Sequence, residues 1–172
     1  MRYARMGIVS LVMIAIGGWL AGGMTFGLAE STEVKIEKID VRLSSQGPVV
    51  LLHVGDRMIP IFVDPTVAGS IQGALTGHKF PRPLSHDLMH SILDAYGVSV
   101  DRVLVTLKNG IYYGTLALSR NGQTKIFDGR SSDAIALGIH FHAPIMVNKD
   151  LLESAGEDSE KIDETTEERV ML

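Results

Sequence analysis

The sequence contains no cysteine and few aromatic residues (6%). The absence of cysteine excludes disulfides, iron–sulfur clusters, thiol catalysis, cysteine-type zinc sites and a lipid anchor on cysteine. The formal net charge of −4 lacks the basic surplus of a general nucleic-acid coat protein. No P-loop, dinucleotide glycine fingerprint or Gly-x-Ser-x-Gly motif is present, which argues against nucleotide-triphosphate and serine-hydrolase chemistry.

The N-terminus differs in composition from the rest of the chain. Arg2 and Arg5 precede an uncharged, largely apolar run over residues 6–29. This pattern is typical of an export signal or a signal anchor. Gly27 and Ala29 are small residues at a spacing that a signal peptidase accepts, but the run is also long enough to span a bilayer, so cleavage and retention both stay open. We expect residues 1–29 to target the chain, which would be exported and either periplasmic or extracellular, or membrane-anchored by residues 6–29.

Alternation of apolar and polar residues predicts a half-buried strand over residues 33–43, with one slip at Lys38. Asn121-Gly122 is the strongest hairpin signal in the chain, and Asn109-Gly110 is a second turn. Further strands are expected at residues 48–54, 58–63, 98–107, 111–118, 124–127 and 144–147.

Helices are expected at residues 65–76, 85–96, 131–141 and 149–155, with caps from Asp64, Ser85 and either Ser131 or Ser132. The second of these helices has an expected buried apolar face formed by Leu88, Met89, Ile92 and Leu93. The predicted fold class is α+β, with a mainly antiparallel sheet of about six or seven strands and three to four helices packed against it. The domain is expected to cover residues 33–155, and the acidic residues 156–172 to form a disordered tail or a frayed helix.

One polar stretch, residues 128–133 (DGRSSD), lies where a strand is expected to pass through a tight turn into a helix. Open α/β folds tend to bind ligands at such junctions, so Asp128, Arg130 and Asp133 are candidates for chemistry. The structural alternative is that Asp133 only stabilises the start of the helix, with Arg130 as its partner.

Histidines supply the second group of candidates. His86 and His90 lie four residues apart on one helix face, a spacing that suits a shared metal, although a surface pair is the favoured interpretation. Asp87 also suits the start of this helix, where His86 could pack or hydrogen-bond locally. His140 and His142 could add ligands, but we favour an imidazolium at a helix C-terminus there.

Acidic residues near helix starts or strand ends could act together if the fold brings them close. Convergence of several of them would suit magnesium or manganese, with Arg82 and Arg130 binding a phosphate. The residues in question are Asp64, Asp87, Asp128 and Asp133.

Several collinear motifs of the chain resemble the bifunctional nuclease (BFN) domain family. They are Leu51-Leu52, residues 59–63 (IPIFV), 82–88 (RPLSHDL), 129–137 (GRSSDAIAL) and 144–147 (PIMV). The resemblance covers residues 34–155. It implies a compact α+β domain, frequent self-association, and the nuclease activity on DNA and RNA that is attributed to plant members. Two departures are Val67, near a position where members often carry glutamate, and Ser131, where they commonly carry proline.

The resemblance and the placement of these groups lead to one functional hypothesis, a nuclease that hydrolyses phosphodiester bonds of DNA or RNA. His86, Asp87 and Asp133 would be catalytic, with Asp87 and Asp133 also holding a divalent metal. Arg82, Arg130 and Ser132 would bind phosphate. The rival hypothesis is a non-catalytic extracytoplasmic binding or assembly module, in which the same charges form a buried network. Expected partners are nucleic acid, the membrane if the N-terminal segment is retained, and further copies of the chain.

Overall fold

A computed structural model describes residues 32–158 of the chain. The predicted targeting segment (residues 1–29) and most of the acidic tail lie outside these residues. Among the helices of residues 32–158, none is long and apolar enough to cross a membrane.

The first of two sheets has the strand order β1–β8–β5–β6–β7. Its strands are β1 (Glu33–Lys35), β8 (Ile145–Asn148), β5 (Ser99–Lys108), β6 (Ile111–Arg120) and β7 (Gln123–Arg130). Only β5 and β8 pair in parallel; the other neighbours in this sheet are antiparallel. Asn109-Gly110 and Asn121-Gly122 turn the chain with φ of 52° and 75° in each pair, the left-handed backbone that two-residue hairpin loops require.

The second sheet has the order β2–β3–β4–β9 and is antiparallel throughout. Its strands are β2 (Lys38–Ser44), β3 (Gly47–Val54), β4 (Arg57–Phe62) and β9 (Glu157–Asp158). The α+β class is therefore confirmed, but the strands are divided between two sheets instead of forming one. Because Glu157 and Asp158 pair with β4, the folded part extends beyond the expected start of the acidic tail.

The strand expected over residues 33–43 is in fact two strands, β1 and β2, in different sheets. At the break, the N–H of Ile36 donates to the carbonyl of Ile145 in the first sheet, and the N–H of Glu37 donates to the carbonyl of His53 in the second. The slip in the apolar pattern near Lys38 marks the place where the chain crosses between the sheets.

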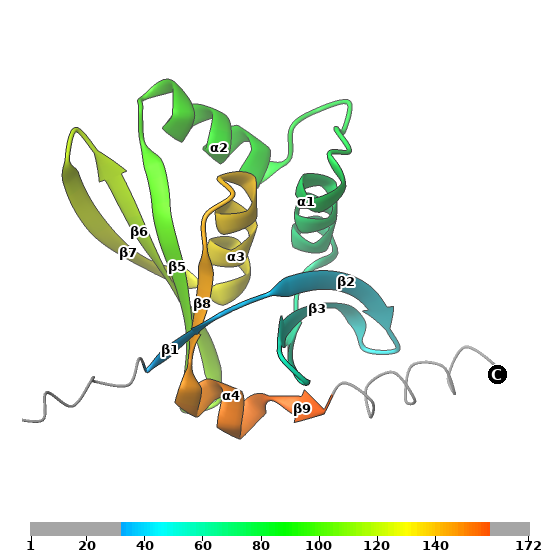
Figure 1. Ribbon diagram of the computed structural model, residues 1–172. Coiled ribbons are helices and arrows are strands. Elements are labelled where there is room, and N and C mark those ends of the chain that lie inside the picture. Colours follow the sequence, from blue (N-terminus) through cyan, green and yellow to red (C-terminus); the bar gives the residue numbers. More distant parts are fainter. Residues whose placement is uncertain (1–31, 159–172) are drawn as a thin grey trace, which may run out of the picture. The chain divides into compact units, whose positions relative to one another are not determined.

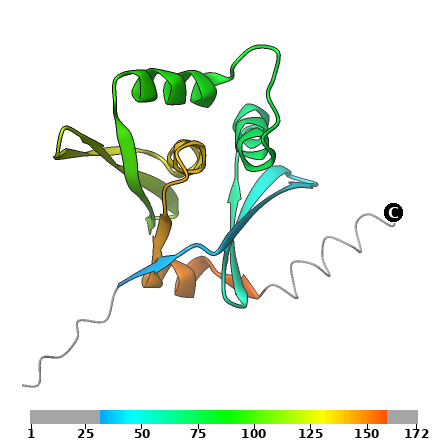
Figure 2. The same cartoon turned by 45° about the horizontal axis from the view of Figure 1, so that its top comes forward.

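Four helices complete this part of the chain: α1 (Pro65–Thr76), α2 (Ser85–Ala95), α3 (Ser131–His140) and α4 (Lys149–Ala155). Helix α1 packs on β2 and β3, α3 packs on β5 and β6, and the two helices contact each other. Figures 1 and 2 show α1 and α3 between the two sheets, with α2 lying across them. The core joins both sheets to these helices through fully buried side chains such as Leu52, Ile59, Ile71, Val103 and Ile135.

Helix α2 does not bury its apolar face, contrary to expectation. Leu88, Met89 and Ile92 are 53%, 41% and 49% exposed, whereas His86 is only 6% exposed. The reason is tertiary: α2 packs on α3 through the face that carries His86 and His90, so its apolar positions point away from the core.

Candidate functional site

The starts of three helices meet at Arg130, the last residue of β7. Its guanidinium binds Asp133, in the first turn of α3, through Nε–Oδ2 (2.8 Å) and Nη2–Oδ1 (3.0 Å). Its Nη1 also donates to Oδ2 of Asp64, the residue before α1, at 3.1 Å. His86, in the first turn of α2, places Nε2 3.2 Å from Oδ1 of Asp133. We call Asp64, His86, Arg130 and Asp133 the helix-start cluster.

The cluster depends on how β7 passes into α3. No separate turn intervenes, because β7 extends to Arg130 and α3 begins at Ser131. We had expected Ser131 or Ser132 to cap the helix, but neither does. Both are buried in its first turn. Asp128, by contrast, is exposed in β7 and outside the cluster.

Two other predicted caps are also wrong. The carboxylate of Asp64 makes no capping bond to α1 and binds Arg130 instead. Helix α2 is capped not by Ser85 but by Asp87, whose Oδ2 accepts a hydrogen bond from the N–H of Leu84 at 2.8 Å. Tertiary ion pairs and the register of the first turn determine these contacts. The residue types alone do not determine them.

The charges of the cluster stabilise one another. Hydrogen bonds from Arg130 hold the pKa of Asp133 below its ordinary value, against the opposing effect of partial burial. The same bonds, together with those to Asp64, raise the pKa of Arg130. Since the guanidinium already hydrogen-bonds two carboxylates, it could bind a phosphate only if its bonds to one of them were broken.

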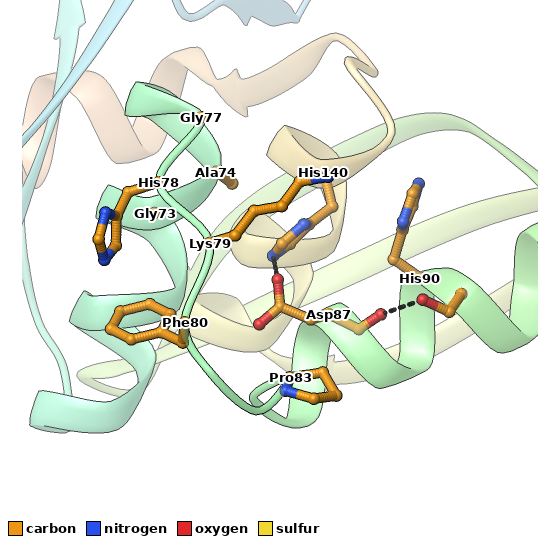
Figure 3. Close-up of a pocket in the computed structure, with 11 residues that line it drawn as sticks. Gly73, Ala74, Gly77, His78, Lys79, Phe80, Pro83, Asp87, His90 and His140 are labelled. Carbon is orange, nitrogen blue, oxygen red and sulfur yellow. Dashed lines mark hydrogen bonds and ion pairs between the residues drawn. The ribbon is translucent and has the colours of Figure 1, made fainter.

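A cavity of about 400 Å³ lies beside this cluster, between α1, α2, α3 and the loop that joins α1 to α2. Asp87 and His90 of α2, His140 of α3 and Lys79 of the loop line it. Figure 3 shows the carboxylate of Asp87 and the imidazole of His140 pointing toward each other across the space.

His140 is the most constrained titratable residue of the cavity. Its side chain is 9% exposed, and Nε2 lies 3.1 Å from Oγ of Ser70 and 3.9 Å from Oδ1 of Asp87. Burial lowers the pKa of this imidazole, although the Asp87 charge acts in the opposite direction. The side chain thus points inward, where burial disfavours the imidazolium that we expected at this helix C-terminus.

The other histidine expectations are partly corrected. His90 stacks on His140 with ring centroids 5.7 Å apart and touches the ring of Phe141 edge-on. His86 is buried against Asp133, so His86 and His90 are not a surface pair. His86 hydrogen-bonds a tertiary partner, Asp133 of α3, instead of a local group at the start of its own helix.

The predicted site residues thus fall into separate places. Asp133, His86 and Arg130 join the helix-start cluster, while Asp87 lines the cavity. Ser132 is 8% exposed, and Arg82 is exposed on the loop between α1 and α2. Sequence reasoning gave His140 no catalytic role; the one signal was that it recurs at the apolar spacing of α3, which predicts an inward side chain.

A metal site is not preformed in the part of the chain that the structure describes. There, no group of three or more His, Asp or Glu side chains has the geometry to hold an ion. The two carboxylates expected as ligands have different partners: Asp133 binds Arg130 and His86, and Asp87 caps α2. The described donors therefore do not fit a magnesium or manganese ion.

Comparison with known proteins identifies the family. A family model of the bifunctional nuclease domain matches residues 49–160. An uncharacterized protein of Mycobacterium tuberculosis is 35% identical over 127 residues, which are 72% of this chain and 76% of that protein. Bifunctional nuclease 1 of Arabidopsis thaliana is 31% identical over 116 residues (63% of this chain, 36% of that protein), and bifunctional nuclease 2 is 32% identical over 103 residues (58% and 31%). This chain spans about a third of the length of these plant relatives. It belongs to the bifunctional nuclease domain family.

Proposed function

We propose that this chain is a nuclease that hydrolyses phosphodiester bonds in the cavity between α1, α2 and α3. The observation that carries the proposal is the pair formed by Asp87 and His140, which face each other in a cavity open to solvent. Membership of a family whose plant members are named nucleases supports the same reaction class.

His140 suits the role of general base. Burial lowers the pKa of this imidazole and so favours its neutral form, which can accept a proton. If Nε2 carries the hydrogen and donates it to Oγ of Ser70, Nδ1 holds the lone pair. Water would then attack the phosphorus as it gives a proton to His140, and the same proton would pass to the departing oxygen. The products are a phosphomonoester and a free hydroxyl.

Asp87 would stabilise the imidazolium that forms during this step. Its Oδ1 faces His140 while Oδ2 is held by the N–H of Leu84, so the carboxylate is fixed in orientation. His86, Asp133 and Arg130 fit a positioning role better than the catalytic and phosphate-binding roles predicted for them, because they bind one another and do not line the cavity. They would hold the start of α2, and with it Asp87, against α3.

A nuclease assay on the purified chain tests the proposal, with single-stranded DNA and RNA in magnesium, manganese or chelator. Asp87→Asn and His140→Gln should each lower the cleavage rate at least 100-fold while the protein stays folded. His142→Asn is the matched control: it removes an exposed imidazole two residues away, at a φ of 53° that asparagine tolerates. Equal rates in all four proteins would point to a contaminating nuclease and overturn the proposal.

A second candidate function, a non-catalytic binding or assembly module, is favoured by the outer face of α2. Leu88 and Ile92 are about half exposed, and Tyr96, one helical turn further on, is 64% exposed. Such an unpartnered apolar face suits association with a second copy of the chain. Light scattering at several concentrations would detect an oligomer, and Ile92→Glu should dissociate it without lowering the unfolding midpoint.

We also propose export or membrane tethering, on the N-terminal sequence alone. Cell fractionation with an antibody to the folded domain tests it: the full chain should leave the cytoplasm, and a chain that begins at residue 31 should not. Recovery of the full chain in the cytoplasmic fraction would contradict the proposal.

A further inference from the structure

The loop between α1 and α2 forms one wall of the cavity and carries its own chemistry. Two cations, Lys79 and Arg82, alternate there with the aromatic rings of His78 and Phe80. His78, Lys79 and Phe80 all line the cavity. Basic and aromatic side chains in alternation are typical of surfaces that bind single-stranded nucleic acid.

Packing on α1 holds this loop in place. The ring of Phe80 lies over two glycines of the helix: a Cβ atom built on Gly73 would meet Cε2 of Phe80 at 3.1 Å, and one on Gly69 would meet Cζ at 3.7 Å. His78 contacts Phe80 edge-on with ring centroids 5.1 Å apart. The prolines at 81 and 83 restrict the backbone further. The wall of the cavity is therefore preformed.

The two cations of the loop make no ion pair within the described part of the chain. Lys79 and Arg82 are both exposed, and neither has a hydrogen bond or ion pair with another described residue. This distinguishes them from Arg130, whose guanidinium is held by Asp64 and Asp133. Figure 3 shows the Lys79 side chain reaching from the loop toward His140. Arg82 directly precedes Pro83, which lines the cavity.

The size of the cavity limits what can reach His140. A volume of about 400 Å³ is at the lower end of the range for sites that hold one small ligand. A duplex presents its phosphates on a stiff, stacked rod, and a nucleotide can enter such a pocket only when it is unstacked. A single strand meets this requirement without the free-energy cost of unpairing.

We infer that the cavity takes one nucleotide of a single-stranded nucleic acid, with Lys79 and Arg82 on the flanking phosphates and the rings of Phe80 and His78 against the base. This inference rests on the proposed function and names the substrate class of that site. It makes Lys79 and Arg82 binding residues and leaves the proton transfer to His140 and Asp87.

Fluorescence anisotropy of the full chain tests the inference. The probes are a labelled phosphorothioate 12-mer, which resists cleavage, and the duplex of the same sequence, both at 150 mM salt. We expect the single strand to bind at least tenfold more tightly than the duplex. Lys79→Ala and Arg82→Ala should each weaken single-strand binding about fivefold, and each should reduce the slope of log K against log[salt] by about 0.7.

Lys125→Ala is the matched control, because it removes the same charge from an exposed position in β7 that does not line this cavity. The inference is overturned if the duplex binds as tightly as the single strand, if the Lys79 and Lys125 variants bind alike, or if neither probe binds. Cleavage separates the two proposals. Lys79-dependent single-strand binding without any cleavage would contradict the nuclease proposal but not the inference. His140-dependent cleavage of duplex and single strand at equal rates would contradict the inference but not the nuclease proposal.

Discussion

Arg130 and Asp133 are joined by two hydrogen bonds, Nε–Oδ2 at 2.8 Å and Nη2–Oδ1 at 3.0 Å, across the junction of β7 and α3. Asp133 also hydrogen-bonds the buried His86 of α2, and Arg130 also donates to Asp64 before α1. One bidentate pair therefore links the three helices that surround the cavity.

Asp133→Ala should destabilise the domain, because it leaves His86 buried without its carboxylate partner. A loss of about 1–3 kcal/mol in the free energy of unfolding is expected from an unsatisfied buried polar group. Urea denaturation followed by circular dichroism measures it. Asp128→Ala is the control, since Asp128 is exposed in the adjoining strand. Equal midpoints for the two variants would show that the cluster does not hold the helices together.

The same pair predicts how stability depends on acid. Hydrogen bonds from Arg130 hold the pKa of Asp133 below its ordinary value of about 3.9, so the unfolded chain takes up a proton there before the folded one does. The resulting stabilisation is complete above about pH 5 and is lost as the pH falls through the folded-state pKa. Unfolding midpoints between pH 6 and pH 3 should fall more steeply for the natural chain than for Asp133→Asn. Parallel curves would contradict this.

His140 predicts a second pH dependence, at higher pH. Burial lowers its pKa below the ordinary value of about 6.5, so between the two values the unfolded chain again binds more protons than the folded one. Stability should therefore decline as the pH falls from 7.5 to 5.5. His140→Gln should remove part of this decline, measured as the shift in thermal midpoint, whereas His142→Asn should keep it. An unchanged slope in His140→Gln would mean that folding does not lower the pKa of this imidazole.

Two substitutions of Asp87 should separate its structural role from its chemical one. Asp87→Ala removes the acceptor for the N–H of Leu84 and should cost about 0.5–2 kcal/mol, the usual effect of losing a helix cap. Asp87→Asn keeps an acceptor oxygen and should be nearly as stable as the natural chain. Under the proposed mechanism both variants lose cleavage. Full cleavage by the stable asparagine variant would remove Asp87 from the chemistry.

A close approach between β6 and α3 yields a prediction with an internal control. A Cβ atom on Gly114 would lie 2.5 Å from Cβ of Ala134 and 2.9 Å from the carbonyl oxygen of Arg130. Gly129, its direct partner in the sheet, has open space around the same position. Gly114→Ala should therefore cost about 1–3 kcal/mol or more by overpacking, and Gly129→Ala should cost much less. Chemical denaturation of both proteins measures the difference, and similar losses would contradict the close approach.

Much of the fold could be predicted from local patterns. The Asn-Gly pairs predicted both turns of the β5–β6–β7 meander, and the helix expected at residues 65–76 has the bounds of α1. These features are local because the backbone conformations they favour depend on one or two residues. The division into two sheets was not predictable in the same way, since the crossing at Ile36 and Glu37 involves partners more than fifteen residues away in the chain.

For the site too, some features follow from local sequence and others only from tertiary contacts. By itself, the sequence determined the α+β class, the family motifs and the placing of Asp64, His86 and Asp133 at helix starts, because these follow from residue type and spacing. Only the tertiary structure decided that Arg130 joins the three starts and that α2 turns its histidines inward. It also decided that His140 faces Asp87 across a cavity. Those contacts join residues 3 to 66 positions apart, and their energies depend on burial and distance, which no local pattern specifies.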